Sequence, residues 1–456
     1  MQRSRAFLVA GCFFMEMLDT TVVTTAAPLI GHSLNQPPTA ISVVITAYLL
    51  ALAVFIPVGG WLITRWTART VFTTAIVVFT VASLACGFAP SLGWLVLARV
   101  VQGVGGALMV PVGRQVVLRS AAKTDVLRLM SYIVWPGLLA PVVAPLIGAV
   151  IAEQLSWEWI FWVNVPLGVV AAVVAWRIMP DDVEGPPRRL DWVGVAVVGG
   201  GLGTALWAAH LIADTGAGAG IIAAWIAAPV ILCALACRHL LSTPTPVVDL
   251  RLLGNRVFGL SQAGMAGFFM VVMAIPFLMP LMMQTAFGWS PVRSGVLVMF
   301  VFIGNVGIKP ATTPLLNAFG FRTVLGVSTL GLAATAVALG CATASTPAWL
   351  IAVVALVSGV FRSTALTAYS TIGFATIDVA DRRTANTVAA TVQQVASGLG
   401  VAVAAVGVRL GAAITGDTTA SGTYFWAFLV AGAVALASLI AVARLPRQAG
   451  AELRTR

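Results

Sequence analysis

The sequence contains few charged residues. Asp, Glu, Lys and Arg together make up 9% of its 456 residues, whereas 60% are hydrophobic. A soluble globular protein carries roughly 25% charged residues, so this scarcity excludes an ordinary soluble fold. The mean hydropathy of +1.00 points the same way. The composition therefore predicts a protein that crosses a lipid bilayer many times.

Histidine and cysteine are also scarce, with three and five residues. The cysteines fall in apolar segments without metal-ligand spacing, so we expect neither a metal site nor disulfide bonds. No G-x-x-x-x-G-K-[ST] phosphate-binding loop occurs, which argues against transport driven by ATP. No nucleophile–base pair indicates an enzyme, and the histidines lie at or near the ends of apolar segments. We expect a protein that is not an enzyme and has no bound cofactor.

Long apolar segments dominate the sequence instead. A helix that spans the bilayer needs about 20 apolar residues, and these segments lack the short alternating pattern of β-barrel strands. Fourteen segments qualify: 6–31, 39–63, 70–90, 92–118, 127–152, 159–179, 191–212, 218–238, 257–284, 291–316, 322–343, 347–374, 384–411 and 423–444. The prediction is an all-α membrane protein with fourteen transmembrane helices.

Basic residues lie mainly in alternate connections between these segments. With the N-terminus assigned to the cytoplasm, 20 of the 26 Lys and Arg residues fall on the cytoplasmic side. Opposite loops such as "GHSLNQPPTA" and "GDTTASGT" carry none. This positive-inside pattern predicts a multi-pass protein of the inner membrane with both termini in the cytoplasm. The net charge of +11 then reflects topology and not nucleic-acid binding.

Two charged, Pro-rich connections divide the chain, "MPDDVEGPPRRLDW" and "RHLLSTPTPVVDLRLLGNR". We predict four parts: an N-terminal six-helix half (1–180), two inserted accessory helices (181–240), a C-terminal six-helix half (241–446) and a cytoplasmic tail (447–456). Two halves around a midplane cavity are typical of secondary transporters.

The segment "LARVVQGVGGALMVPVGR" places Arg99, Gln102, Gly103 and Gly106 on one helical face. Glycines at this spacing let another helix approach closely. Arg99 lies deep enough to need a partner, and an Arg that snorkels to the interface is the alternative interpretation.

The segment "WPGLLAPVVAPLIGAVI" contains Pro136, Pro141 and Pro145, with Gly137 and Gly148 on either side. Each proline removes a helical hydrogen bond, so a kinked helix is expected. The kink either serves gating or is static.

Together with "MLDTTVVTTAAPLI", "SWEWIFWVNVPLG" and "PLMMQTAFGWSPVRSGVLV", these motifs resemble the major facilitator superfamily, and in particular its fourteen-helix drug:proton antiporter branch. The resemblance covers nearly the whole chain. The runs "GALMVPVGR" and "VGIKPATTPLLNAFGFRTVL" are similar to those of MdtD-type transporters. The resemblance implies the major facilitator fold, with two six-helix halves plus two inserted helices. It also implies proton-coupled, multidrug-type efflux by alternating access, driven by the proton gradient.

The resemblance also implies roles for individual residues. It assigns Asp19 to the acid of the first helix and Arg99 to proton coupling. It assigns gating or helix packing to Gly103, Gly106, Pro141, Pro145, Gly148, Gly60 and Arg65. In "GWLITRWTAR", however, Thr64 replaces the family's acid and Thr67 its glycine. The cytoplasmic latch that this acid supports is therefore either weakened here or built otherwise.

Glu16 and Asp19 share one face of the first segment, with Asp19 near mid-membrane. Burial favours the neutral form of a carboxylate, and a nearby Arg favours the charged form. A carboxylate that alternates between such surroundings can carry a proton. We predict that Asp19, Glu16 and Arg99 couple protons, with Arg99 as the partner of Asp19. The alternative is a structural pair or a polar anchor for helix packing.

Lys309 and Arg362 lie within apolar segments of the second half, where no acid occupies a comparable position. We predict a substrate cavity lined by Lys309, Arg362, Arg114, Gln102 and Tyr369, although Lys309 and Arg114 are also placed to snorkel. The buried bases leave open an exporter of an anionic metabolite or organic acid. A non-transporting sensor or scaffold is a further alternative. The expected partners are a small-molecule substrate and the lipid bilayer, and an envelope adaptor is left open.

Overall fold

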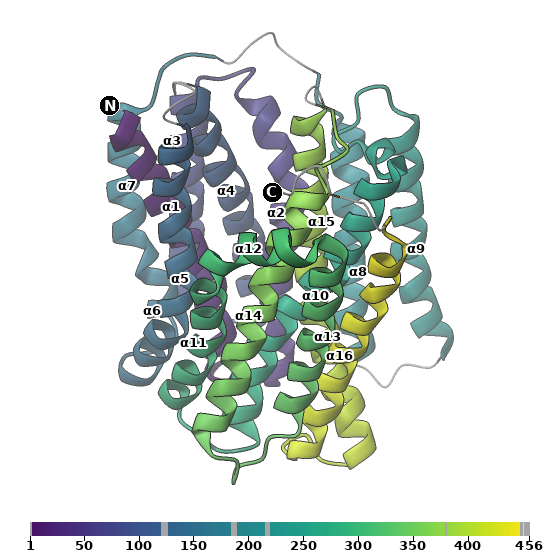
Figure 1. Cartoon of the computed structure of the whole chain (residues 1–456). Coiled ribbons are helices and arrows are strands. Elements are labelled where there is room, and N and C mark those ends of the chain that lie inside the picture. The colour runs from purple at the N-terminus through teal and green to yellow at the C-terminus, as the bar shows by residue number, and fades with distance from the viewer. Residues whose placement is uncertain are drawn as a thin grey trace. The chain divides into compact units, whose positions relative to one another are not determined.

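The computed structural model describes residues 2–119, 126–183, 189–214, 219–378, 381–446 and 450. The chain divides into two compact units, Met1–Val247 and Val248–Arg456. Throughout the described residues the regular structure is helical (Figure 1). This agrees with a sequence in which long apolar segments must satisfy their backbone hydrogen bonds internally.

The first unit contains nine α-helices within its described residues. They are α1 (Gln2–Ser33), α2 (Ser42–Leu62), α3 (Ala68–Gly87), α4 (Leu92–Arg119), α5 (Val126–Gln154), α6 (Trp159–Trp162), α7 (Asn164–Ile178), α8 (Trp192–Asp214) and α9 (Ala219–Ser242). A short 3₁₀ turn, η1 (Pro38–Ile41), leads into α2. Helix α1 packs on α5, α4 packs between α2 and α3, and α8 packs on α2 and α9.

The second unit is also built from helices. It contains η2 (Leu250–Gly254), α10 (Arg256–Thr285), α11 (Pro291–Gly307), α12 (Lys309–Phe319), α13 (Phe321–Gly340), α14 (Ala348–Ile372), α15 (Arg382–Thr415) and α16 (Ser421–Arg444). Helix α11 packs on α14, α13 packs on α16, and α10 packs on α15 and α16.

Each of the fourteen predicted segments coincides with a helix or with two consecutive helical pieces. In the described part of the chain, eleven helices are long and apolar enough to cross a membrane, and a twelfth span results if α11 and α12 are counted together. Helices α8 and α9 contribute only shorter described apolar stretches, Trp192–Ala208 and Ala227–Ser242. The all-α, multi-pass prediction is confirmed, and the crossing of the membrane by α8 and α9 stays a prediction.

The span formed by α11 and α12 is bent by 54°. The break falls between Gly307 and Lys309, and Pro310 stands in the first turn of α12. Proline lacks the backbone N–H that would continue the hydrogen-bond ladder, which is an established cause of such kinks. The sequence segment 291–316 predicted one continuous helix here, so the break is a feature that apolar length alone does not reveal.

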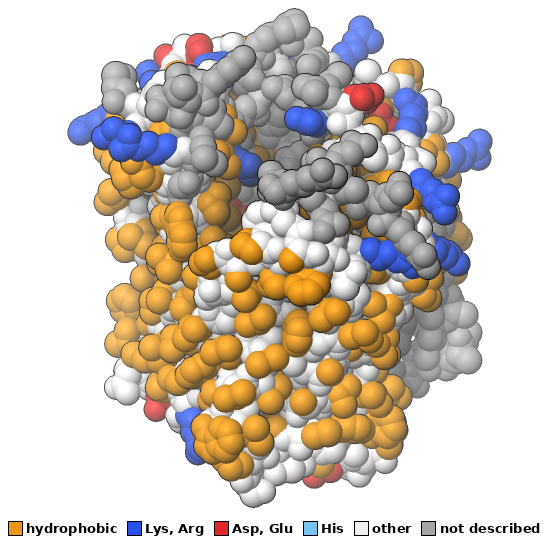
Figure 2. All heavy atoms as spheres, viewed as in Figure 1, with side chains coloured by type: hydrophobic (Ala, Val, Ile, Leu, Met, Phe, Trp, Pro, Cys, Tyr) orange, Lys and Arg blue, Asp and Glu red, His pale blue; other side chains and the backbone are white. Residues whose placement is uncertain are grey.

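The molecular surface has the pattern expected in a bilayer. On the face shown in Figure 2, hydrophobic side chains cover the middle of the helices, and most Lys and Arg side chains lie near the helix ends. Exposed hydrophobic residues such as Leu97, Val170 and Trp349 contribute to such surfaces. A soluble monomer rarely exposes so much contiguous apolar area.

Glycines on α4 set the close packing around the first unit's interior. A Cβ atom added at Gly103 would lie 2.6 Å from the Cβ atom of Ala51 and 2.8 Å from the carbonyl oxygen of Tyr48. One added at Gly106 would lie 2.9 Å from the Tyr48 hydroxyl. Because no side chain intervenes, α2 approaches α4 closely enough to bring Tyr48 against the polar residues of α4.

Candidate functional site

Asp19 lies midway along α1, and none of its side chain is exposed. Its two carboxylate oxygens accept three hydrogen bonds from other helices. Arg99 Nη1 donates to Oδ2 at 2.5 Å, Gln102 Nε2 donates to Oδ1 at 3.1 Å, and Asn164 Nδ2 donates to Oδ1 at 3.0 Å. The predicted partnership of Asp19 with Arg99 is thus present as a buried ion pair.

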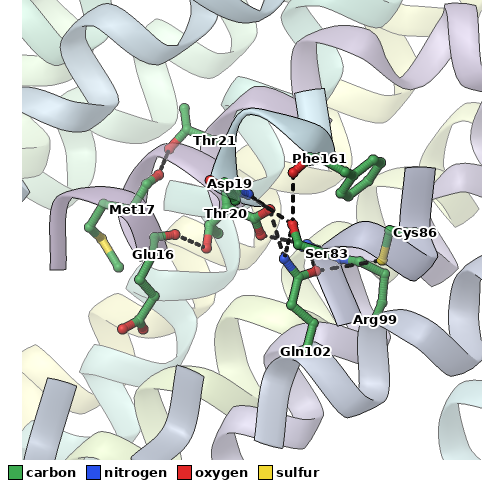
Figure 3. A network of polar contacts seen from close by, with 11 residues as sticks. Glu16, Met17, Asp19, Thr20, Thr21, Ser83, Cys86, Arg99, Gln102 and Phe161 are labelled. Carbon is green, nitrogen blue, oxygen red and sulfur yellow. Dashed lines mark hydrogen bonds and ion pairs between the residues drawn. The ribbon is translucent and has the colours of Figure 1, made fainter. Parts of the chain in front are cut away.

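Ser83 on α3 joins the donors of this network (Figure 3). Its hydroxyl oxygen accepts from Gln102 Nε2 and from Asn164 Nδ2, both at 3.1 Å, and donates to the carbonyl oxygen of Phe161 at 3.0 Å. Gln102 Oε1 in turn accepts from Arg99 Nη1 at 2.7 Å. The side chains come from α1, α3, α4 and α7, so a shift of any of these helices changes the network.

Arg99 is fully buried, and two aromatic rings flank its guanidinium. The guanidinium carbon lies 4.2 Å from the centre of the Tyr48 ring and 5.7 Å from that of Phe161. Its Nε and Nη2 atoms have no hydrogen-bond partner within the described residues. Desolvated rings attract a cation, but they replace only part of the lost hydration. The Asp19 carboxylate is therefore the main compensation for the Arg99 charge.

Glu16 lies one turn before Asp19 on α1, and only 6% of its surface is exposed. Figure 3 shows its carboxyl group pointing away from Asp19 and from Arg99. The Oε2 atom is enclosed and has no hydrogen-bond partner in the described part of the chain. The two acids that the sequence places together are therefore in different surroundings, and they do not form a carboxylate dyad.

The other residues predicted for gating in the first unit lie apart from this network. Gly60 is exposed in the last turn of α2, and Arg65, just beyond it, lies over the ring of Trp61 at 5.9 Å. Pro141 and Pro145 lie within α5. A Cβ atom at Gly148 would meet Val22 of α1 at 2.6 Å, so this glycine lies at the α1–α5 contact.

The residues predicted to line a substrate cavity fall in several places. Gln102 belongs to the Asp19 network, and Arg114 is exposed on α4. In the second unit, Tyr369 is 1% exposed and its ring packs against Phe268 of α10. Lys309 and Arg362 are half-buried in that unit. Lys309 of α12 donates to Thr367 of α14, and Arg362 of α14 donates to the carbonyl oxygen of Val272 of α10.

A polar clip joins the cytoplasm-assigned ends of α3 and α4 to the segment after α7. Arg69 Nη1 lies 3.2 Å from Asp181 Oδ2, and Arg119 pairs with Asp182. The backbone N–H groups of Ala68 and Arg69 donate to the carbonyl oxygens of Asp182 and Pro180 at 3.1 and 3.0 Å. We call these residues, 68–69, 119 and 180–182, the α3–α7 clip. It supplies acids to the region of Thr64, where the resemblance implies an acid.

Thr64 and Thr67 serve local structure. The Thr64 hydroxyl donates to the carbonyl oxygen of Trp61 at 2.7 Å, and the Thr67 side chain caps α3 by accepting from the N–H of Thr70. Threonine is among the residues that stabilise a helix N-terminus in this way.

Neither Ser83 nor Asn164 is among the site residues predicted from the sequence. Both are isolated polar residues in apolar segments, which is the signal that could have found them. Serine gives a weak signal, because its hydroxyl commonly bonds to its own helix backbone. Among the described residues, no group of three or more His, Cys, Asp or Glu side chains could hold a metal ion.

Comparisons with known proteins agree with this fold. A model of the Major Facilitator Superfamily matches residues 9–401 and, in a second match, residues 268–455. The "Putative multidrug resistance protein MdtD" of Cronobacter sakazakii is 34% identical over 456 residues, which cover 97% of this chain and 95% of that protein. The protein of the same name from Citrobacter koseri is 32% identical, with coverage of 97% and 95%.

Solved structures show the same fold at much lower identity. The D-xylose-proton symporter superposes with a TM-score of 0.70 at 14% identity, covering 98% of each chain. The POT family transporter PepTSo gives a TM-score of 0.68 at 14% identity, covering 97% of this chain and 98% of that one. The helical membrane fold and the family match together define a transporter of the facilitator class. The chain belongs to the Major Facilitator Superfamily.

Proposed function

We propose that this protein is a secondary active exporter that exchanges protons for lipophilic small molecules of the multidrug type. Three things support the proposal: membership of the family, relatives described as multidrug resistance proteins, and the buried Asp19–Arg99 pair. The pair is the observation that supports proton coupling. A fully buried ion pair contributes little net stability because desolvation offsets its attraction, and ionisable residues inside membrane spans mark functional sites.

Asp19 is the proposed proton carrier. In the arrangement seen here its carboxylate compensates Arg99 and accepts from Gln102 and Asn164. A proton on Asp19 removes the charge that Arg99 requires, and an uncompensated buried charge costs about 3–5 kcal/mol. Protonation therefore favours an arrangement of α1 and α4 in which Arg99 finds other partners or water. Coupling between protonation and helix position is what an antiporter needs.

Glu16 is the proposed second protonatable group. It faces away from Asp19 and lacks a cationic partner among the described ion pairs. A carboxyl group in such a place can gain or lose a proton only when water or another proton donor or acceptor reaches it. Its proton exchange would follow changes in access to α1 and not changes in the Arg99 contact.

The α3–α7 clip is the proposed replacement for the missing acid of the family's loop. It ties Arg69 and Arg119 to Asp181 and Asp182. Exposed pairs of this kind are individually weak, and a weak contact is suited to a latch that must open in every transport cycle. Gly60, in the last turn of α2, and Arg65, in the connection to α3, lie next to this latch. On α4 and α5, Gly103, Gly106, Pro141, Pro145 and Gly148 would allow the helices to shift.

Inner-membrane location with both termini in the cytoplasm is part of the proposal, and it rests on the distribution of Lys and Arg along the sequence. The two six-helix halves would be 1–180 and 241–446, with the helices between them accessory to transport. Asp191 and His239, which pair at 2.8 Å, would then fasten the two ends of this accessory pair together.

Everted membrane vesicles test the function directly. With an imposed pH gradient, acid inside, vesicles containing the protein should accumulate a lipophilic dye. Collapse of the gradient by a protonophore should release it. ATP without a proton gradient should support no accumulation. Vesicles that accumulate no member of a broad panel of lipophilic compounds would contradict the proposed function.

A further inference from the structure

Lys309 and Arg362 lie within apolar segments of the second unit and pair with no acid among the described residues. Lys309 begins α12 and Arg362 lies on α14. The acids in the described part of this unit, Asp249, Asp378, Asp381 and Asp417, all lie outside its α-helices. No ion pair of Lys309 or Arg362 with an acid occurs among the described residues. This contrasts with Arg99, whose charge Asp19 compensates.

Arg362 has unused hydrogen-bonding capacity. Its Nη1 atom donates a single, long bond of 3.3 Å to the carbonyl oxygen of Val272. Its guanidinium carbon lies 5.0 Å from the centre of the Phe302 ring on α11. A guanidinium has five N–H donors in a planar fork that matches a carboxylate. The residue is half-buried, and its guanidinium makes no other hydrogen bond within the described residues.

Lys309 is placed at the break in the α11–α12 span. The two helices meet there at 54°, and the first turn of α12 has no side-chain cap. The N-terminus of a helix carries a partial positive charge that attracts anions. In transporters, broken helices use such ends to bind anionic substrate groups. Lys309 Nζ adds a full charge at this end, and within the described residues it donates only to Thr367 Oγ1, at 3.2 Å.

Both cations lie where the α11–α12 span packs on α14. Arg362 reaches from α14 toward Phe302 of α11, and Lys309 reaches from α12 toward Thr367 of α14. Residues 362 and 367 are separated by roughly 8 Å along the axis of α14 and by about 140° around it. Ser363, on the same face as Thr367, is fully buried and its hydroxyl has no hydrogen-bond partner in the described part.

We infer that Arg362 and Lys309 form an anion subsite that holds the carboxylate of an amphipathic substrate. The inference rests on the proposed export function and gives it a substrate class: lipophilic molecules that carry a carboxylate or a similar acid group. The guanidinium fork binds the two carboxylate oxygens, and Lys309 with the α12 N-terminus supplies further positive potential. Desolvation of the anion is compensated because two cations without acid partners are already in place.

Binding in detergent tests the subsite without depending on transport. The probes are dansylglycine, which is an anion, and its uncharged methyl ester, and the signal is dansyl fluorescence on the purified full-length protein. The wild type should bind the acid at least roughly tenfold more tightly than the ester, the range expected for hydrogen bonds to a charged group. Arg362→Gln and Lys309→Gln should each reduce this preference, and the double variant should abolish it.

Matched variants separate binding from folding. Arg293→Gln removes an exposed cation of α11 that lies 3.7 Å from the centre of the Trp289 ring, and it should leave the preference unchanged. Arg362→Lys keeps the charge without the fork and should retain part of the preference. Arg362→Gln should melt at the same temperature as the wild type or higher, because it removes an uncompensated charge. A lower melting temperature with an unchanged acid preference would assign Arg362 to structure and overturn the inference.

Binding and export together distinguish this inference from the proposed function. If ester and acid bind the wild type equally, the anion subsite is contradicted, whether or not the vesicles export the ester. If the acid is preferred and the preference depends on Arg362, the subsite stands. In that case, failure of gradient-driven export would contradict the transport proposal alone.

Discussion

Arg99 Nη1 and Asp19 Oδ2 lie 2.5 Å apart in the interior of the first unit, and neither side chain is exposed. Buried pairs of this kind contribute little net stability, because desolvation offsets their attraction, but removing one partner alone is costly. The pair therefore links the charge on α1 to the position of α4. Its energetic and functional consequences can be measured separately.

The first prediction concerns stability. Asp19→Asn leaves Arg99 as a buried cation without a carboxylate and should destabilise the protein by about 3–5 kcal/mol. The double variant Asp19→Asn/Arg99→Gln should lose less than the sum of the two single variants, because it contains no uncompensated charge. Thermal unfolding of the purified protein measures the coupling. Asp19→Asn combined with Gly93→Ala serves as the additive control, since Gly93 has no neighbouring atom within 4 Å.

The second prediction concerns the close approach of α2 and α4. A Cβ atom at Gly103 would lie 2.8 Å from a backbone oxygen of α2, so Gly103→Ala should cost about 1–3 kcal/mol through overpacking. Gly93→Ala, on the same helix, meets open space and should be neutral or stabilising by up to about 1 kcal/mol. Equal melting temperatures for the two variants would show that α2 and α4 are not held at this distance.

The third prediction concerns the α3–α7 clip. Its pairs are partly exposed, with 28% and 58% of the Arg69 and Asp181 side chains accessible. Asp181→Asn/Asp182→Asn should therefore lower stability by less than about 1 kcal/mol per pair. Its expected effect is on the rate of export, up to about fivefold, with the number of protons exchanged per substrate unchanged. Asp378→Asn, in the second unit, is the control. A changed proton ratio would assign the clip to coupling instead of gating.

The fourth prediction concerns pH and the junction of α8 and α9. Asp191 precedes α8; burial raises its pKa, but hydrogen bonds from His239, Gly194 and Val247 outweigh this and hold the pKa below its ordinary value of 3.8. A depressed pKa contributes stability that is fully present above the unfolded value and is lost as pH falls through the folded value.

The melting temperature of the wild type should accordingly fall on acidification from about pH 5 to pH 3, as Asp191 becomes protonated. Asp191→Asn should begin lower at neutral pH and show a smaller fall over that range. Circular dichroism in detergent follows both proteins. Parallel pH profiles would show that the Asp191 contacts add nothing to the stability of this junction.

Much of the fold could be predicted from apolar length and charge alone. Each predicted segment coincides with helical structure because a membrane span has few alternatives. The break at Lys309 was missed, since hydropathy does not register a missing N–H at Pro310. Helix α6 is separated from α7 only by Val163, whose backbone stays in the helical region, so the two pieces form the single span that the sequence predicted.

The candidate site was only partly predictable. The Asp19–Arg99 partnership could be predicted because a buried charge needs an opposite one nearby. This requirement identifies partners that are 80 residues apart in the sequence. Ser83 and Asn164 bring neutral polar groups, which have many possible partners, so sequence could not assign theirs. The divergent environments of Glu16 and Asp19 depend on side-chain direction, and spacing alone suggested that they act together.

The most direct test of the account is proton coupling in Asp19→Asn. Proteoliposomes with an imposed pH gradient report substrate flux and, through an internal pH-sensitive dye, the protons exchanged. The account predicts that Asp19→Asn still exchanges labelled for unlabelled substrate without a gradient but no longer accumulates it against one. An unchanged ratio of protons to substrate in this variant would contradict the role of Asp19.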